Sequence, residues 1–137
     1  MNRTTDPDGA GGAGAGSERD ARPDDPALAV VSDLFFVARI RETGRLAGVP
    51  VEFARTPEQI EAALGRSPRL VLIDLTAAFD YERLFGALER ARPPVLGFTT
   101  HALARETQVW HARCDRVVTK ETLTQELPQL LKDGVKT

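Results

Sequence analysis

Residues 70–76, LVLIDLT, decide the fold of this chain. Their first four residues are aliphatic, which predicts a strand buried on both faces, as in the middle of a parallel sheet. The aliphatic run stops at Asp74. Because an unpaired buried charge is costly, this carboxylate should lie where the strand leaves the core. In an open α/β sheet that place is the carboxyl edge, where ligands bind. Asp74 is therefore the first candidate for a reactive residue.

The composition of the 137-residue chain is that of one ordinary globular domain. Hydrophobic residues make up 42% of it and charged residues 28%. The net charge of −2 gives no indication of a nucleic-acid partner. Cys114 is the only cysteine, which excludes an intramolecular disulfide and a multi-cysteine zinc site. The sequence has neither an apolar run long enough to span a membrane nor a hydrophobic export signal, so we expect a cytoplasmic protein.

The first 26 residues differ in composition from the rest of the chain. Residues 9–16 are an unbroken run of Gly and Ala, with Asp, Arg and Pro on both sides. Such a stretch has little apolar surface to bury and cannot offset its conformational entropy. We therefore expect a disordered tail at 1–26 and a single folded domain at 27–137. A flexible spacer is the simplest role for the tail, and binding of a partner stays open.

Strand and helix patterns alternate five times after the tail. Strands are expected at 28–31, 49–55, 70–73, 95–98 and 115–120, and helices at 36–47, 57–64, 81–88, 103–114 and 123–131. The second helix has a strong start, with Thr56 at the N-cap, Pro57 at the first helical position and Gln59 three residues after the cap. Pro128 lies inside the last pattern, so that helix either begins late, near Thr124, or is kinked.

This alternation predicts an α/β fold. Right-handed crossovers make it a five-stranded parallel sheet with helices on both faces. For five strand–helix units we expect the flavodoxin-like (βα)5 arrangement, with strand order 2-1-3-4-5.

Polar residues stand where four of the five predicted strands end. The first strand is followed by Ser32 and Asp33, the third by Asp74, the fourth by Thr99, and the fifth ends at Lys120. In a parallel sheet these ends share one edge. Each residue alone has a structural explanation, such as a helix N-cap for Asp33 or a solvated side chain for Lys120. Together they favour a cleft with two carboxylates, a hydroxyl and an ammonium.

These groups suit phosphoryl transfer to a carboxylate. Asp74 would attack a phosphoryl group and form an aspartyl phosphate. Lys120 and the Thr99 hydroxyl would neutralise and orient the phosphoryl oxygens. Both residues end strands that follow the strand of Asp74 in the predicted sheet order.

The same edge offers ligands for Mg²⁺. Asp33, Asp74 and the backbone carbonyl of Thr76 would supply the oxygen ligands that this hard cation prefers. Ser32 is a further candidate that would act through a water molecule. The ion would share the neutralisation of the phosphoryl charge with the lysine.

The folded part resembles the receiver domain of bacterial two-component response regulators. The matching segments are 30–33 (VVSD), 70–74 (LVLID), 94–99 (PVLGFT) and 115–120 (DRVVTK). The resemblance covers residues 27–133 and implies that Asp74 is the phospho-acceptor, Asp33 a metal-binding acid, Thr99 the switch hydroxyl and Lys120 the phosphate-binding lysine. It also implies a histidine kinase or phosphotransfer protein as phosphodonor and a downstream protein as target, with no nucleic-acid or membrane partner.

The sequence departs from the receiver pattern at several positions. Receivers carry two adjacent acids after the first strand, and here the first is Ser32. The proline that usually follows the lysine is Glu121, and the aromatic switch position is Val117. The loop after Asp74 lacks the usual proline and is about one residue short. These departures bear on metal affinity and on switching.

Three functional hypotheses follow. The first is a stand-alone receiver that is phosphorylated and then docks to another protein; no output domain fits after Lys120, so its chemistry goes no further than accepting its own phosphoryl group. The second is a pseudo-receiver, a binding module that works without phosphorylation. The third, a flavin-binding electron carrier, is disfavoured because residues 32–36, SDLFF, are acidic and then apolar, instead of forming a Ser/Thr/Gly-rich phosphate cradle.

Other residues are interpreted as structural. His101 and His111 are too few and too badly spaced for a metal site. Trp110 is expected to pack in the core or against a partner. Leu34 and Phe35 flank the buried stripe of the first helix and would form an apolar patch for a partner if both are exposed.

Overall fold

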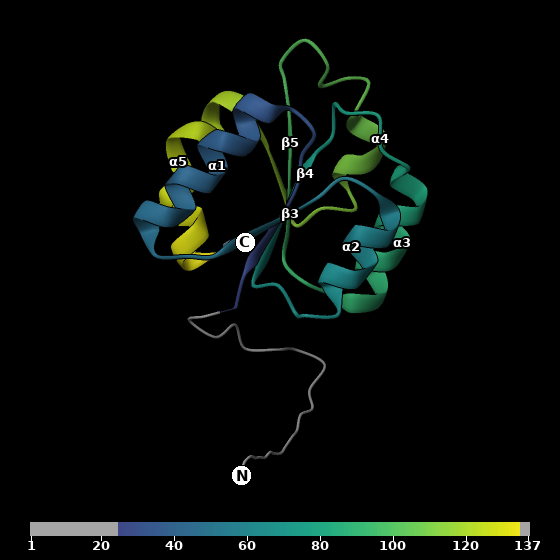
Figure 1. Cartoon of the computed structure of the whole chain (residues 1–137). Coiled ribbons are helices and arrows are strands. Elements are labelled where there is room, and N and C mark those ends of the chain that lie inside the picture. The colour runs from purple at the N-terminus through teal and green to yellow at the C-terminus, as the bar shows by residue number, and fades with distance from the viewer. Residues whose placement is uncertain (1–24, 135–137) are drawn as a thin grey trace.

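The computed structural model describes residues 25–134 and contains a five-stranded sheet (Figure 1). The strands lie in the order β3 (Val51–Ala54), β2 (Ala27–Val30), β4 (Leu70–Asp74), β5 (Val95–Thr99) and β6 (Arg116–Thr119). All neighbouring strands are parallel. The predicted strand order 2-1-3-4-5 is therefore confirmed. The predicted tail, residues 1–26, lies outside the described residues except for its last two.

Helices cover both faces of the sheet, as predicted (Figure 1). Helices α1 (Leu34–Ala47) and α5 (Lys120–Asp133) pack on one face, and α2 (Pro57–Leu64) and α3 (Tyr81–Ala91) pack on the other. A short helix, α4 (Gln108–His111), precedes β6. None of the helices within residues 25–134 combines the length and apolar character that crossing a membrane requires.

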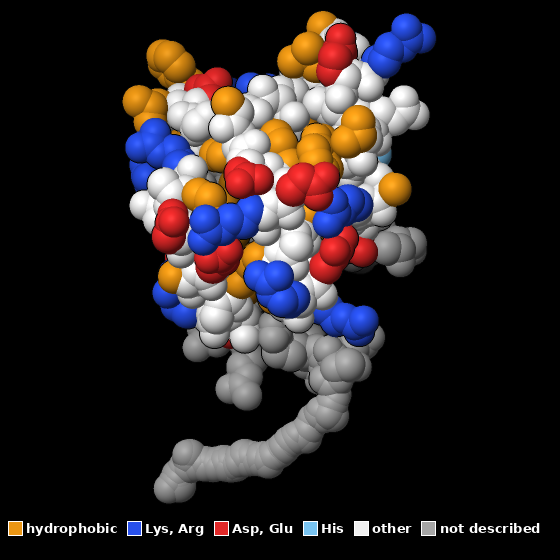
Figure 2. All heavy atoms as spheres, turned by 90° about the vertical axis from the view of Figure 1, so that its right-hand side faces the viewer, with side chains coloured by type: hydrophobic (Ala, Val, Ile, Leu, Met, Phe, Trp, Pro, Cys, Tyr) orange, Lys and Arg blue, Asp and Glu red, His pale blue; other side chains and the backbone are white. Residues whose placement is uncertain are grey.

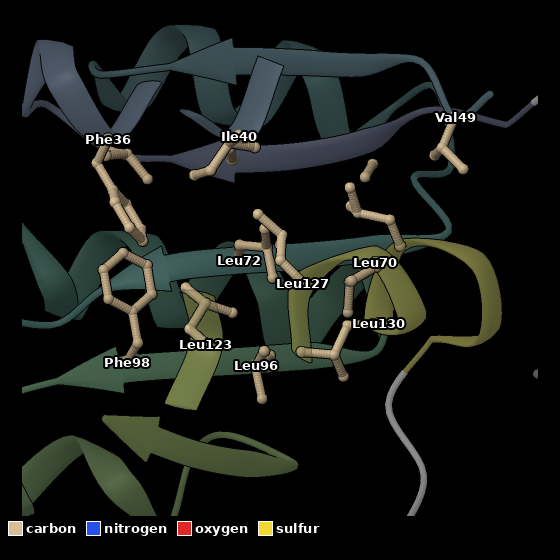
Figure 3. Close-up of a cluster of buried hydrophobic side chains, with 14 of the residues drawn as sticks. Phe36, Ile40, Val49, Leu70, Leu72, Leu96, Phe98, Leu123, Leu127 and Leu130 are labelled. Carbon is tan, nitrogen blue, oxygen red and sulfur yellow. The ribbon is translucent and has the colours of Figure 1, made fainter. Parts of the chain in front are cut away.

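The central strand β4 separates two hydrophobic clusters. Leu70 and Leu72 belong to the cluster beneath α1 and α5 (Figure 3), and Val71 and Ile73 belong to the cluster beneath α2 and α3. This strand is buried on both faces, as its aliphatic run predicts. Side chains alternate between the faces of a strand. Asp74, two residues after Leu72, therefore lies on the α1–α5 side of the sheet.

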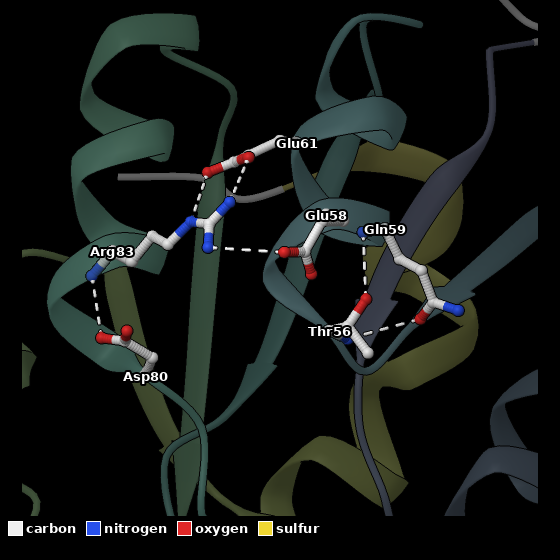
Figure 4. Close-up of polar contacts among 6 residues, drawn as sticks. All are labelled: Thr56, Glu58, Gln59, Glu61, Asp80 and Arg83. Atoms are coloured by element: carbon white, nitrogen blue, oxygen red, sulfur yellow. Dashed lines mark hydrogen bonds and ion pairs between the residues drawn. The ribbon is translucent and has the colours of Figure 1, made fainter.

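The second helix begins with the predicted capping box (Figure 4). The Thr56 hydroxyl accepts a hydrogen bond from the Gln59 amide at 3.1 Å, and the Gln59 side chain accepts one from the Thr56 amide at 3.3 Å. Between α2 and α3, the Arg83 guanidinium contacts the carboxylates of Glu61 at 2.9 Å and Glu58 at 3.6 Å. Acidic and basic side chains are interspersed over this side of the molecule (Figure 2), where such exposed pairs add little to stability.

The predicted fourth helix, 103–114, is mostly wrong. Only the four residues of α4 are helical, and residues 101–107 form turns. Threonine hydroxyls compete with helical hydrogen bonding here. The Thr100 hydroxyl accepts a hydrogen bond from the Leu103 amide at 3.2 Å, and the Thr107 hydroxyl contacts the Ala104 carbonyl at 3.3 Å. Of the residues whose spacing suggested a helix, Thr107 is buried in a turn, Trp110 lies in α4 and Leu103 is exposed.

The last helix does not begin late. Helix α5 begins at Lys120, directly after β6, and continues through Pro128 to Asp133. The Thr119 hydroxyl caps it by accepting a hydrogen bond from the Thr122 amide at 3.2 Å. Pro128 suggested a late start near Thr124. The cap at Thr119 explains why the helix instead starts four residues earlier, at Lys120.

Candidate functional site

Asp74 ends the central strand with its side chain almost entirely buried, at 4% exposure. Its Oδ1 atom accepts hydrogen bonds from the Thr76 amide at 2.8 Å and the Thr76 hydroxyl at 2.6 Å. Within residues 25–134, no hydrogen bond or ion pair reaches its Oδ2 atom. A buried polar atom without a partner is costly and unusual in a folded protein. Oδ2 is therefore the atom at this site that a cation or a reacting group would satisfy.

Asp33 serves two neighbours, one with each carboxylate oxygen. Oδ1 caps α1 by accepting hydrogen bonds from the amides of Phe35 at 2.9 Å and Phe36 at 3.3 Å. Oδ2 lies 3.7 Å from the Lys120 ammonium, which also lies 5.0 Å above the centre of the Phe36 ring. The N-cap explanation is thus correct for one oxygen, while the other faces a cation. The Lys120 and Asp33 side chains are 36% and 44% exposed, so solvent screens this pair and it adds little stability.

The contact between Asp33 and Lys120 reaches across the sheet. β2 and β6 are separated by β4 and β5, which puts the two strands about 14 Å apart. The two side chains therefore meet above the ends of the intervening strands, on the α1–α5 side. Asp74 ends β4 on that same side. We call Asp33, Asp74 and Lys120 the charged half of the site.

An open groove of about 740 Å³ lies beside the charged half, between α1 as far as Thr43 and the start of α5 as far as Thr124. Its lining includes both charged and aromatic residues, among them Asp33, Phe35, Arg39, Lys120 and Glu121. Asp74 does not line this groove, so the groove is a neighbour of the buried carboxylate and not its pocket.

Thr99 faces away from the charged half. It follows Phe98, which packs in the cluster under α1 and α5, so alternation places Thr99 on the other side of the sheet. Its hydroxyl accepts a hydrogen bond from the Thr107 hydroxyl at 3.0 Å, and Thr107 Oγ1 lies 2.8 Å from Nε2 of His111. No hydrogen bond within the described residues joins Thr99 to Asp74. We call Thr99, Thr107 and His111 the hydroxyl half of the site.

Tyr81, the first residue of α3, is a further site residue. Its hydroxyl lies 2.7 Å from the carbonyl oxygen of Asp74 and 2.8 Å from that of Ala77, and its one proton is shared between these two acceptors. Burial, and then the negative charge of Asp74, raise the pKa of the Tyr81 phenol well above its usual value. The neutral phenol therefore closes the loop that follows Asp74.

The residues at this edge fit Mg²⁺, although they form a sparse ligand set. No group of three acidic, histidine or cysteine side chains in residues 25–134 is placed to hold a metal ion. Mg²⁺ needs only one or two carboxylates because it keeps several of its waters. Asp33 and Asp74 are the two carboxylates at this edge, and Oδ2 of Asp74 has no partner among the described residues. Thr76 uses its amide and hydroxyl on Asp74, so only its carbonyl remains as a ligand. Ser32 is exposed.

Comparison with known proteins shows the fold. No protein-family model matches the chain, and neither does any curated protein. The receiver domain of a sensor histidine kinase from Pseudomonas aeruginosa PAO1, determined with a magnesium ion in its active site cleft, is similar with a TM-score of 0.64, at 20% identity over 79% of this chain and 94% of that one. A response regulator from Hahella chejuensis has a TM-score of 0.66 at 13% identity, over 83% and 100% of the two chains.

A designed protein shows how far this likeness extends. A de novo Rossmann 2x3 protein is similar with a TM-score of 0.60 at 11% identity, over 81% of this chain and 92% of that one. The same arrangement of strands and helices thus occurs in natural receivers and in a protein designed for its fold. The function has to be argued from the side chains at the edge of the sheet.

Proposed function

We propose that this chain, which has the fold of a response-regulator receiver domain, takes part in phosphorelay signalling by accepting a phosphoryl group on Asp74. The observation that carries the proposal is the buried carboxylate at the end of the central strand, with one oxygen held by Thr76 and the other without a partner in residues 25–134. Oδ2 attacks the phosphorus atom, an O–P bond forms, and the bond to the donor's leaving group breaks.

Asp33 and Lys120 complete the charged half in this proposal. Asp33 Oδ2, Asp74 and the Thr76 carbonyl would hold Mg²⁺, which supplies positive charge to the phosphoryl oxygens. The similar receiver domain of the Pseudomonas sensor kinase, which has magnesium in its cleft, supports this assignment. The Lys120 ammonium, held near the end of β4 by Asp33 and Phe36, adds a second positive charge where negative charge develops in transfer.

The phosphodonor in this proposal is a histidine kinase or a phosphotransfer protein. The first turn of α1 has two exposed apolar side chains, Leu34 at 69% and Phe35 at 91% exposure, next to Asp33. Exposed apolar residues beside a reactive site are typical of a docking surface. A donor that covers them would bring its phosphorylated side chain to the carboxyl edge of the sheet.

The test is intact-mass analysis after incubation with acetyl phosphate and Mg²⁺. We expect one added phosphoryl mass on the wild type and none on Asp74→Asn. Asp80→Asn is the matched control, because Asp80 is an exposed aspartate that caps α3 and an asparagine can also cap. That variant should be labelled like the wild type. Equal labelling of wild type and Asp74→Asn would remove Asp74 from the role.

The alternative function is that of a pseudo-receiver, a protein-binding module that needs no phosphorylation. Ser32 in place of a second acid favours this alternative, as does the hydrogen bond that holds the Thr99 hydroxyl away from Asp74. If the wild type stays unlabelled at millimolar Mg²⁺, with acetyl phosphate and with a phosphorylated histidine donor, the pseudo-receiver becomes the better hypothesis.

A further inference from the structure

Thr107 is a buried polar residue that the proposed phosphoryl transfer does not use. Only three polar or charged residues are fully buried in residues 25–134, namely Asp74, Thr99 and Thr107. Asp74 carries the proposed chemistry, and the Thr99 hydroxyl is the group that the sequence predicts to orient the phosphoryl oxygens. Thr107 lies in the turn segment before α4 and is 5% exposed. Buried hydroxyls are retained where they make hydrogen bonds, so the partners of Thr107 indicate its role.

The Thr107 hydroxyl links the end of β5 to α4. Its oxygen lies 3.0 Å from Oγ1 of Thr99, 2.8 Å from Nε2 of His111 and 3.3 Å from the Ala104 carbonyl. A hydroxyl has one proton to donate and two lone pairs to accept with. When His111 donates from Nε2, the Thr107 proton is free to go to Thr99. The other acceptor near Thr99, the Thr100 carbonyl, is distant at 3.5 Å, so Thr107 is the main hydrogen-bond partner of Thr99.

Alternation places the Thr99 side chain on the side of the sheet opposite Asp74, and this hydrogen bond fixes the direction of its hydroxyl toward Thr107. A phosphoryl group on Asp74 would lie in the charged half, whereas the Thr99 hydroxyl points to Thr107 and makes no hydrogen bond with Asp74 within the described residues. Thr99 is the last residue of β5, so its hydroxyl could contact a phosphoryl oxygen only by turning away from Thr107 and over the end of the strand, and that movement breaks their hydrogen bond. The free protein therefore has one hydrogen bond that the phosphorylated protein loses.

We propose that Thr107, anchored by His111, is a positioning residue that holds the Thr99 hydroxyl away from Asp74 until a phosphoryl group arrives. This proposal rests on the proposed phosphorylation of Asp74. Under this proposal, residues 100–111 change position on phosphorylation, because breaking the hydrogen bond between Thr99 and Thr107 releases Thr107. Leu103 and Val109, both exposed on this segment at 39% and 66%, would change position with it. By linkage, a partner that binds this segment and separates Thr107 from Thr99 would also favour phosphorylation.

The experiment compares Thr107→Val with Thr107→Ser. Valine has nearly the shape of threonine and lacks the hydroxyl, whereas serine keeps it. We expect Thr107→Val to raise the rate of phosphorylation by acetyl phosphate about two- to tenfold, the effect of removing one neutral hydrogen bond. Thr107→Ser should stay near the wild-type rate. The rate is measured by intact mass against time at fixed Mg²⁺, with the thermal midpoint of each variant as a check on folding.

A second comparison separates positioning from a general loosening of the segment. In a Thr99→Val background, adding Thr107→Val should have no further effect, because no hydroxyl remains to be held. The proposal would be overturned if Thr107→Val still raises the phosphorylation rate in the Thr99→Val background. It would also be overturned if the rate of Thr107→Val alone is equal to or below that of the wild type. A wild type that is never labelled overturns the proposed function together with this inference. A labelled wild type whose rate Thr107→Val does not raise overturns this inference alone.

Discussion

The two halves of the candidate site differ in how far they are assembled. In the charged half, an ammonium already lies 3.7 Å from a carboxylate, and the paired side chains are partly open to solvent. In the hydroxyl half, two buried threonine hydroxyls are bonded to each other at 3.0 Å on the other side of the sheet. Strand ends that share one edge of a sheet do not necessarily share one pocket, because alternation assigns each side chain to a face.

The largest effect is expected in the charged half, from Lys120→Met. Methionine keeps much of the side-chain length but removes the charge that we assign to the phosphoryl oxygens. Loss of one such stabilising group typically slows a reaction about 100-fold. Phosphorylation by acetyl phosphate, followed by intact mass, should show this loss. The thermal midpoint should hardly change, because the contact with Asp33 is exposed and screened.

Lys132→Met is the matched control for this prediction. Lys132 is an exposed lysine near the other end of the same helix, so the change in net charge is identical. Its phosphorylation rate should equal that of the wild type. If both variants lose activity equally, the effect comes from overall charge and the charged half has no special role for Lys120.

Cys114 packs on the α2–α3 side of the sheet, where Thr99 also lies, and its thiol reports how far solvent reaches this side, called here the hydroxyl side. Burial, and then the charge of Asp115, raise the pKa of its thiol from 9.0 to about 11. Only the thiolate reacts with iodoacetamide, so at pH 8 the native protein should react about 100-fold more slowly than a free thiol. The native rate should increase with pH up to about 11, whereas the urea-unfolded chain should level off near 9. A native rate equal to the unfolded rate would show that this side is open.

Gly97→Ala should disturb the hydroxyl side while leaving the charged half intact. A Cβ atom at Gly97 would lie 2.8 Å from Cys114 Sγ and 2.9 Å from Leu75 Cδ1, too close for either contact. Overpacking of this kind costs about 1–3 kcal/mol of unfolding free energy, measured by urea denaturation. Gly86→Ala is the control, since its nearest contact is 3.8 Å and α3 should be stabilised by about 0.5–1 kcal/mol. If Gly97→Ala leaves the free energy of unfolding unchanged, the side chains of Cys114 and Leu75 can move aside at little cost.

The sheet and the start of α2 were predictable because they depend on local pattern. The aliphatic run at 70–73 can only be buried on both faces, and the signals from Thr56 to Gln59 act within one turn. The fourth helix was not predictable by the same means. Its apolar spacing is helical, but the hydroxyls of Thr100 and Thr107 find other partners once the chain is folded.

The candidate site was predictable in its residues and less so in its contacts. Strand ends indicate that Asp33 and Lys120 share an edge, and the structure places their charged groups 3.7 Å apart. Side chains alternate along β5, so an inward-facing Phe98 puts Thr99 on the opposite face of the sheet. This placement of Thr99 could have been predicted from the sequence. The contact between Thr107 and His111 has the i, i+4 spacing of one helical turn, which was the available signal. The hydrogen bonds of Tyr81 depend on a loop conformation that no local pattern specifies.

The smallest effect is expected from Ser32→Asp, which adds a second acid to the charged half. A second carboxylate near the metal ligands attracts Mg²⁺. One pair of unit charges at about 4 Å is worth roughly 4 kcal/mol at an effective dielectric of 20, and desolvation and repulsion between the acids cancel most of it. We therefore expect Mg²⁺ to bind up to about tenfold more tightly, measured by calorimetric titration. Without metal the variant should be less stable than the wild type, because the acids repel one another.

Ser32→Asn isolates the charge in this comparison, because asparagine has the size of aspartate and also offers an oxygen ligand. If the charge acts, only Ser32→Asp binds more tightly, and its advantage shrinks as salt is added, since Ser32 and Asp33 are both exposed. Lys120 weakens the expected gain in Mg²⁺ affinity. A second carboxylate beside Asp33 also attracts the Lys120 ammonium, and the ammonium then competes with Mg²⁺ for the carboxylates. The Mg²⁺ affinity should therefore increase more in Ser32→Asp combined with Lys120→Met than in Ser32→Asp alone. Equal affinities in wild type, Ser32→Asp and Ser32→Asn would mean that Ser32 does not limit the site, and no binding at millimolar Mg²⁺ in any of them would leave the charged half without its metal.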